Sequence, residues 1–185
     1  MDLYNKTSFA ISKLVTKSYS TSFSLGIAAF SPQYRDAIYS IYGFVRIADE
    51  IVDTFNKFDQ KQLMENFRKE TEEALKTGIS TNPILQAFVY TVNAYKIDYH
   101  YIDAFLKSME MDLTNSYYEP QQYNEYIYGS AEVVGLMCLQ IFAGNDDKLF
   151  NSLVAPARSL GSAFQKVNFL RDIKSDMEER ERIYL

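Results

Sequence analysis

The sequence contains no Trp, and it has one Cys and one His among its 185 residues. A lone cysteine excludes a disulfide within this chain, and Cys138 with His100 cannot supply the four ligands of a structural zinc site. Glycine and proline are also scarce, with 7 and 4 residues. Few turns are therefore available, which favours long helices over a sheet of many strands. These absences predict an all-α protein from a reducing compartment such as the cytoplasm.

Charge and hydropathy exclude two further classes of protein. The formal net charge is −5, so nucleic-acid binding is not expected. No uninterrupted apolar run approaches the ~20 residues of a membrane-spanning helix, and Met1 to Lys6 lack the basic stretch of a signal sequence. We therefore do not expect an integral membrane protein. With 185 residues, 47% of them apolar, the chain 1–185 is long enough for a single domain with a substantial core.

Capping signals recur along the chain and predict a series of helices. The expected starts are Ser31-Pro32, Asp59, Asn82-Pro83, Asp98 and Asp146. Gly78 is a typical helix end, and Pro156 predicts a break in the last helical region. The expected helices cover residues 32–54, 59–78, 83 onward, 98–115, 120–143 and 146–179.

Two aspartate pairs, Asp49/Asp53 and Asp172/Asp176, lie inside these predicted helices. Each pair has i,i+4 spacing, at which like charges repel by roughly 0.2–0.5 kcal/mol on an isolated helix. A helix that only had to pack would gain by placing Lys or Arg at one of the two positions. A helix that holds a divalent cation needs both carboxylates on one face, because Mg²⁺ takes oxygen ligands and shares them with substrate phosphates. Two such helices could hold a diphosphate between them.

The residues around each pair admit a structural alternative. On the first helix Asp49 lies at the edge of a wide apolar arc, so Arg46 and another partner could simply neutralise it. On the last helix Asn168 and Gln165 share a narrow sector with Asp172 and no lysine, which could also be a solvated polar face. The same arrangement occurring twice favours a paired site.

Several segments resemble the signatures of the squalene/phytoene synthase family, in that family's order. They are Ser20-Thr21-Ser22-Phe23, Tyr39 to Asp53 (YSIYGFVRIADEIVD), Met111-Asp112-Leu113, Tyr126 to Ala131 with Val134-Gly135, Gln165 to Asp176 (QKVNFLRDIKSD), and Glu181 to Leu185. A single DxxxD motif is weak evidence, but the ordered set spans nearly the whole chain.

The resemblance implies an isoprenoid synthase helical bundle with a central cavity and a Mg²⁺-dependent prenyltransferase, with Mn²⁺ as an alternative metal. The metal-binding positions are Asp49, Asp53, Asn168, Asp172 and Asp176. The substrate-binding positions are Tyr19, Ser20, Thr21, Ser22, Tyr42, Arg46, Gln165 and Arg171. Tyr128 matches a catalytic tyrosine of the cavity.

The implied reaction joins two geranylgeranyl diphosphates into phytoene, in carotenoid biosynthesis. Squalene or dehydrosqualene synthesis from farnesyl diphosphate is the near alternative, and squalene would require NADPH. The lipophilic products suggest a cytoplasmic protein with peripheral membrane contact, and no specific protein partner is expected.

Three departures from the family pattern leave other hypotheses about the function open. Glu132 and Ser108 stand where glycine is common, and the sequence stops at Leu185, before the family's C-terminal helices. We therefore expect a C-terminally incomplete bundle. A non-catalytic assembly factor of the same fold, or a plain helical scaffold, would be free to lose the acidic pairs, yet all four aspartates are present.

Overall fold

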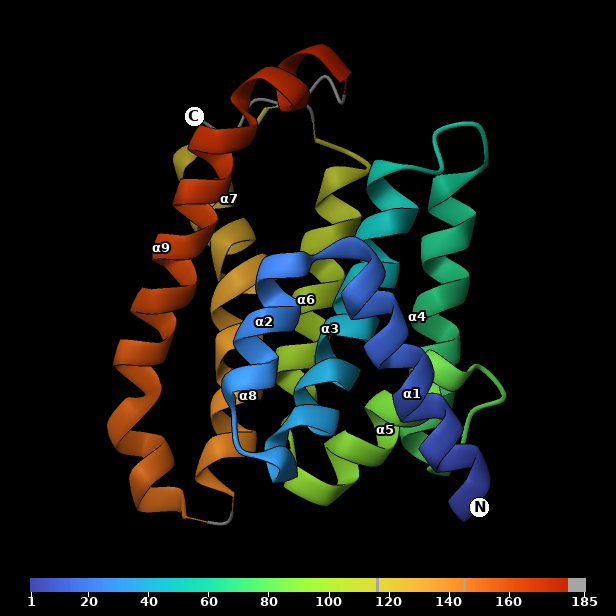
Figure 1. Cartoon of the computed structure of the whole chain (residues 1–185). Helices are drawn as coiled ribbons and strands as arrows, with labels where there is room; N and C mark the ends of the chain where they lie inside the picture. The colour runs from blue at the N-terminus through green and yellow to red at the C-terminus, as the bar shows by residue number, and fades with distance from the viewer. Residues whose placement is uncertain (116, 145, 180–185) are drawn as a thin grey trace.

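The computed structural model describes residues 1–115, 117–144 and 146–179, apart from the side chains of residues 175, 176, 178 and 179. Its regular elements in these ranges are all helical, as the sequence predicts (Figure 1). They are α1 (Asp2–Tyr19), α2 (Thr21–Ala29), α3 (Pro32–Asp53), α4 (Gln60–Thr77), α5 (Pro83–Tyr95), α6 (Tyr99–Asp112), α7 (Pro120–Ile127), the π-helical turn η1 (Tyr128–Glu132), α8 (Val133–Ala143) and α9 (Asp147–Glu179).

Several of the predicted caps act through their side chains, whereas Ser31 precedes α3 without a side-chain cap hydrogen bond. The side chains of Asp59, Asn82 and Asp98 each accept a hydrogen bond from a backbone N–H in the first turn of the helix that follows. These bonds satisfy donors that have no partner within the helix. Gly78 ends α4 with φ +77°, a left-handed conformation that glycine adopts without strain. Short-range chemistry therefore accounts for where these helices start and stop.

The predicted break at Pro156 is wrong, because α9 runs continuously from Asp147 to Glu179. An interior proline removes one hydrogen bond and costs about 3 kcal/mol. Close packing of α9 on α8 offsets this cost: a Cβ on Gly135 would lie 3.2 Å from the carbonyl oxygen of Ala157, the residue after the proline. Tertiary contact here overrides the local signal.

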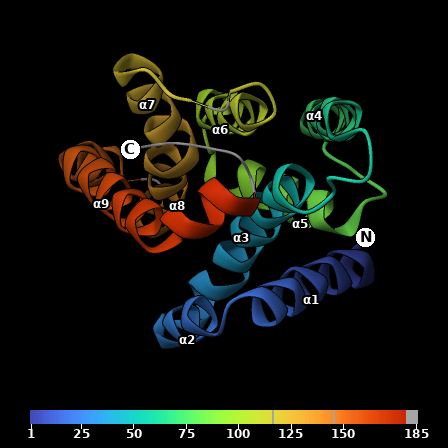
Figure 2. The same cartoon turned by 90° about the horizontal axis from the view of Figure 1, so that it is seen from above.

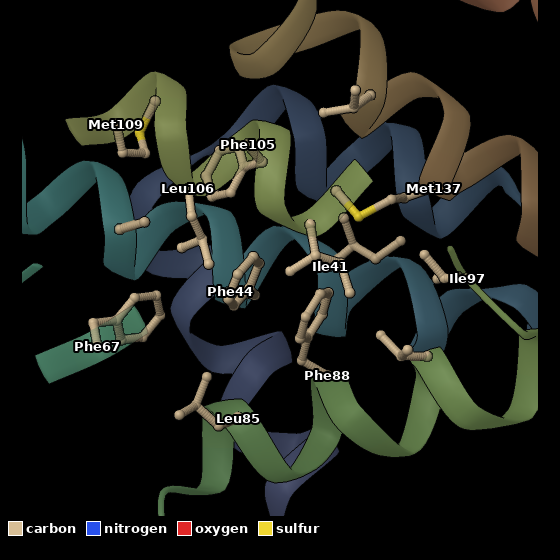
Figure 3. Close-up of a cluster of buried hydrophobic side chains, with 14 of the residues drawn as sticks. Ile41, Phe44, Phe67, Leu85, Phe88, Ile97, Phe105, Leu106, Met109 and Met137 are labelled. Atoms are coloured by element: carbon tan, nitrogen blue, oxygen red, sulfur yellow. The ribbon is translucent and has the colours of Figure 1, made fainter. Parts of the chain in front are cut away.

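The core is built around α3, which packs against α1, α5, α6 and α8. Figure 3 shows its aromatic centre, where Phe44 of α3 stacks on Phe88 of α5 with ring centroids 3.9 Å apart. Phe105 of α6 packs 5.5 Å from the same ring, and all three side chains are fully buried. This packing fixes the direction of α3, and with it the positions of the polar residues along that helix.

Helices α7 and α8 with η1 form one long segment, Pro120–Ala143, that is apolar enough by length and composition to cross a membrane. Half of its most apolar window is buried in the protein, and its packing partners include α3, α6 and α9. The sequence predicts a helix over these residues, but not one apolar enough to pass as a membrane span, because polar residues interrupt its apolar runs. Its burial is that of a core helix of the bundle.

At η1 the backbones approach very closely. A Cβ on Gly129 would lie 2.5 Å from the carbonyl oxygen of Ala104 in α6, and a Cβ on Gly161 of α9 would lie 2.8 Å from that of Ala131. Glycine is needed at both positions to let the helices pack. The π-helical turn is thus held between α6 and α9.

Candidate active site at one end of the bundle

Four helix segments converge at one end of the molecule. Helices α3 and α6 end there, α7 begins there, and the last turns of α9 bend across that end towards α3 (Figures 1 and 2). The aspartates Asp49 and Asp53 lie in the last turns of α3, and Asp112 is the last residue of α6. The fold therefore gathers acidic residues that are far apart in the sequence.

Asp49 shows how close these acidic groups are. The pKa of Asp49 is raised from 3.8 to about 7, mainly by burial and further by the charges of Asp53, Asp112 and Glu50, while the charge of Arg46 opposes the shift. Packing alone would not select carboxylates that repel one another in this way. A bound cation would relieve the repulsion, so the arrangement suits a metal site.

Arg46, one turn before Asp49, is the cationic member of the site. Its guanidinium lies 4.5 Å from the centre of the Tyr19 ring and forms an ion pair with Glu50. Burial by itself would lower the pKa of Arg46, but the hydrogen bond to Glu50 and the charges of Asp49 and Glu50 raise it above its ordinary value. The buried Nε of Arg46 has no hydrogen-bond partner in the structure. This donor is available to an anionic group.

The start of α2 lies beside Arg46 and Tyr42. Ser20 caps α2, with its Oγ accepting a hydrogen bond from the backbone N–H of Phe23 at 3.2 Å. The Phe23 and Tyr42 rings lie 5.4 Å apart. Burial raises the pKa of Tyr42, while the Arg46 charge and a hydrogen bond with Ser20 counteract the shift. Thr21 and Ser22 follow in the exposed first turn of α2, so this predicted group shares one region with Arg46.

Helix α9 turns its polar row towards the interior. Gln165, Asn168 and Asp172 are partly buried, and Phe169 in the same sector is 4% exposed. The rest of the helix surface carries exposed apolar residues: Leu160, Phe164, Val167, Leu170, Ile173 and Met177. This orientation is the reverse of a solvated polar face.

Two further predicted residues lie near the end of α9. Arg171 donates two hydrogen bonds to Asp172, at 2.7 and 2.6 Å. Arg171 is exposed and Asp172 is partly buried, so this pair lies at the edge of the site. The side chain of Asp176 and residues 180–185 lie outside the described residues.

Tyr128 points away from the acidic residues. Its hydroxyl lies 3.1 Å from Nε2 of His100, and the Arg158 guanidinium lies 5.1 Å from the centre of its ring. His100 is at the start of α6 and Asp112 at its end, which are about 18 Å apart at 1.5 Å per residue. Glu132, which stands where glycine is common in the family, binds Arg158 at 2.6 Å and so joins the same group.

A second tyrosine, Tyr126, is not among the predicted site residues, yet it reaches the acidic end. Its hydroxyl donates to Asp112 at 2.8 Å, and that of Tyr118 donates to the other carboxylate oxygen at 2.7 Å. Two residues along a helix correspond to a rotation of about 200° around its axis. Tyr126 and Tyr128 therefore lie on nearly opposite sides of the helix. The YxY spacing was therefore the signal that only one of them could face the site.

Within the parts of the chain that the structure describes, no three Asp, Glu, His or Cys side chains come close enough to hold a metal ion. The donors nonetheless have suitable chemistry, because carboxylate and amide oxygens are the ligands that Mg²⁺ takes.

Comparisons with known proteins identify the family and agree with this fold. The sequence model of the squalene/phytoene synthase family matches residues 16–185, and the chain belongs to that family. The chain is 32% identical over 177 residues to the chloroplastic phytoene synthase of Daucus carota, covering 92% of this chain and 44% of that protein. It is 29% identical over 188 residues to the phytoene synthase of Arthrospira platensis, covering 96% and 60%.

Two solved structures share the fold. The squalene synthase HpnC of Alicyclobacillus acidocaldarius superposes with a TM-score of 0.83 at 23% identity, over 98% of this chain and 66% of that one. A dehydrosqualene synthase crystallised with a ligand gives a TM-score of 0.84 at 24% identity, over 98% and 62%. The predicted isoprenoid synthase bundle is confirmed. The chain spans less than two thirds of each of these four proteins.

Proposed function

We propose that the acidic end of the bundle binds a prenyl diphosphate with Mg²⁺ and catalyses head-to-head condensation of two such molecules. Phytoene from geranylgeranyl diphosphate is the proposed product. The observation that carries the proposal is the set of mutually repelling carboxylates around Asp49, held beside the cationic Arg46. Repelling acids next to an arginine suit a metal–diphosphate pair, in which the cation meets the acids and the anion meets the arginine.

The proposed metal ligands are the aspartates of both pairs and Asn168. When bound, Mg²⁺ would stabilise the charge on the departing diphosphate, and Mn²⁺ is an alternative. Arg46, oriented by Glu50 and Tyr19, would donate to phosphate oxygens through its fork of N–H groups. Arg171 at the edge of the site would add a second cation.

The aromatic residues beside Arg46 suit the organic half of the substrate. Ionisation of an allylic diphosphate leaves a carbocation that must be kept from water. The Phe23–Tyr42 ring pair would exclude water there and attract positive charge through its ring faces. The lipophilic product agrees with the proposed cytoplasmic location at a membrane surface.

A product assay on this chain tests the proposal. The chain is incubated with Mg²⁺ and either geranylgeranyl or farnesyl diphosphate, with and without NADPH, and the extracted hydrocarbon is identified by mass. A forty-carbon product supports phytoene synthesis. A thirty-carbon product made only from farnesyl diphosphate moves the assignment to the squalene side, and dependence of a reduced product on NADPH identifies squalene itself.

Asp49→Asn and Asp172→Asn are the decisive variants. Each should lower turnover by about 10²-fold or more, because charge stabilisation at the leaving group is a large part of such catalysis. Asp103→Asn is the matched control, since Asp103 pairs with Arg68 and Lys107 away from the site. Wild-type turnover in both test variants would rule out the proposed site. A folded wild-type chain that forms no product would refute activity of this chain.

A further inference from the structure

Asp112 ends α6 as a buried carboxylate with two phenol donors. It is 8% exposed, and its Oδ1 and Oδ2 accept hydrogen bonds from Tyr118 and Tyr126 at 2.7 and 2.8 Å. The two rings pack edge to face, with centroids 5.1 Å apart. An ionised carboxylate is acceptor-only at both oxygens, so it can receive both hydroxyls at once. An amide of the same shape would present a donor to one of them.

Tyr126 connects the Asp112 carboxylate to α9. The ring centroid of Phe169 lies 6.0 Å from that of Tyr126 and 5.7 Å from that of Tyr123. Phe169 immediately follows Asn168 and precedes Asp172 by three residues. A shift of Tyr126 would therefore move the part of α9 that carries the inward polar row.

Helix α6, which ends at Asp112, packs directly against α3. The hydrogen bond from Tyr126 to Asp112 and the contact of Tyr126 with Phe169 therefore connect α9 to the helix that packs on α3.

We propose that Asp112 is a positioning residue: it holds the hydroxyls of Tyr118 and Tyr126, and through the Tyr126–Phe169 contact it sets α9 opposite the aspartates of α3. This inference rests on the proposed function, since the quantity it controls is diphosphate binding between the two helices. Asp112 acts through Tyr126 and α9 rather than by contacting the substrate.

The test measures Mg²⁺-dependent binding of geranylgeranyl thiodiphosphate, an analogue that ionises slowly, together with the unfolding temperature. The proteins are the wild-type chain, Asp112→Asn, Tyr126→Phe and the double variant. Asp112→Asn and Tyr126→Phe should each weaken binding about tenfold, a factor that corresponds to ~1.4 kcal/mol. The double variant should also bind about tenfold more weakly, not a hundredfold, because both changes break one linkage.

Asp103→Asn is the control for loss of an α6 carboxylate. Asp103 bonds to Arg68 and Lys107 on the side of α6 that faces α4, so its removal should lower the unfolding temperature and leave binding unchanged. A purely structural Asp112 would behave in the same way as Asp103.

The outcomes separate the two proposals. If the wild-type chain binds no analogue, the proposed function fails and this inference fails with it. If the wild-type chain binds and Asp112→Asn binds equally well, or if the double variant loses about a hundredfold, only the positioning role is overturned. If Asp112→Asn does not fold, Tyr118→Phe and Tyr126→Phe decide, and wild-type binding by both overturns the inference.

Discussion

The guanidinium of Arg46 lies 4.5 Å from the centre of the Tyr19 ring, which joins the end of α1 to α3 beside the acidic residues. The contact combines a cation–π attraction with the Glu50 ion pair on the same side chain. Because Arg46 is fixed from both sides, its unpartnered Nε is held in one direction. This preorganisation matters more for binding an anion than the charge alone.

Arg46→Lys should therefore weaken Mg²⁺-dependent binding of inorganic pyrophosphate, although the charge is retained. We expect about a tenfold loss, because a lysine lacks the planar fork of donors and stacks less well on tyrosine. Tyr19→Leu should cause a smaller loss, about two- to fivefold, since the cation–π contact is worth ~0.5–1 kcal/mol at a partly exposed site. Isothermal titration measures both. Equal affinity of Arg46→Lys and the wild-type chain would contradict the role of the fork.

Asp49→Asn should stabilise the metal-free protein above about pH 7. The folded pKa of Asp49 is raised from 3.8 to about 7, so between these values the folded state holds more protons than the unfolded state and stability falls as pH rises. Above about pH 7 the carboxyl is ionised in both states, and the loss of stability caused by Asp49 reaches its full value. We expect a gain of ~1–2 kcal/mol for Asp49→Asn, because one pKa unit corresponds to 1.36 kcal/mol and solvent at the partly exposed carboxyl reduces the full effect.

Urea unfolding at pH 5, 7 and 9 in the presence of a chelator checks the effect of Asp49. The difference between the variant and the wild-type chain should grow from pH 5 to about pH 7 and then stay constant. A difference that is independent of pH would show that the Asp49 carboxyl is not perturbed in the folded protein.

Gly161→Ala should destabilise the fold, because the new Cβ would lie 2.8 Å from the carbonyl oxygen of Ala131. Overpacking of this kind costs roughly 1–3 kcal/mol. Gly26→Ala is the matched control within a helix, since no atom lies within 4 Å of its added Cβ. We expect Gly26→Ala to stabilise by about 0.5–1 kcal/mol. Denaturant unfolding compares the two, and a stable Gly161→Ala protein would contradict the close approach of η1 and α9.

Arg68→Met should be strongly destabilising, because Arg68 links α4 to α6 through Asp103 and Glu110. The bonds are 2.8 Å to Asp103 and 2.6 Å to Glu110, and the Arg68 side chain is 17% exposed. Removing one partner of a largely buried pair costs about 3–5 kcal/mol, and we expect the lower end here since Glu110 is partly solvated. Thermal unfolding measures the change.

Lys69→Met provides the neighbouring comparison for Arg68. The Lys69–Glu65 pair is exposed at both ends, and such pairs contribute about 0–1 kcal/mol. The two variants should therefore differ clearly although both remove one cation from α4. A similar loss for both would contradict a special role for the α4–α6 linkage.

Much of the helical architecture was predictable, because it depends on residues close in sequence. Asp59, Asn82 and Asp98 cap the expected helices through bonds spanning two or three residues. The i,i+4 aspartate spacing likewise needs only the pitch of a helix. The Pro156 prediction failed because packing of α9 on α8 outweighs one lost hydrogen bond, and no short window of sequence contains that contact.

In the candidate site, too, some features follow from residues close in sequence and others from contacts between distant residues. The sequence by itself determined that Asp49 and Asp53 share one helix face, and that Gln165, Asn168 and Asp172 share another. Only the tertiary structure decided that the α9 row faces inward and that Tyr126, rather than Tyr128, reaches Asp112. Periodicity defines relative directions around one helix axis, whereas the absolute direction of a face depends on contacts between residues far apart in the chain, such as Tyr126 with Asp112 and Phe169.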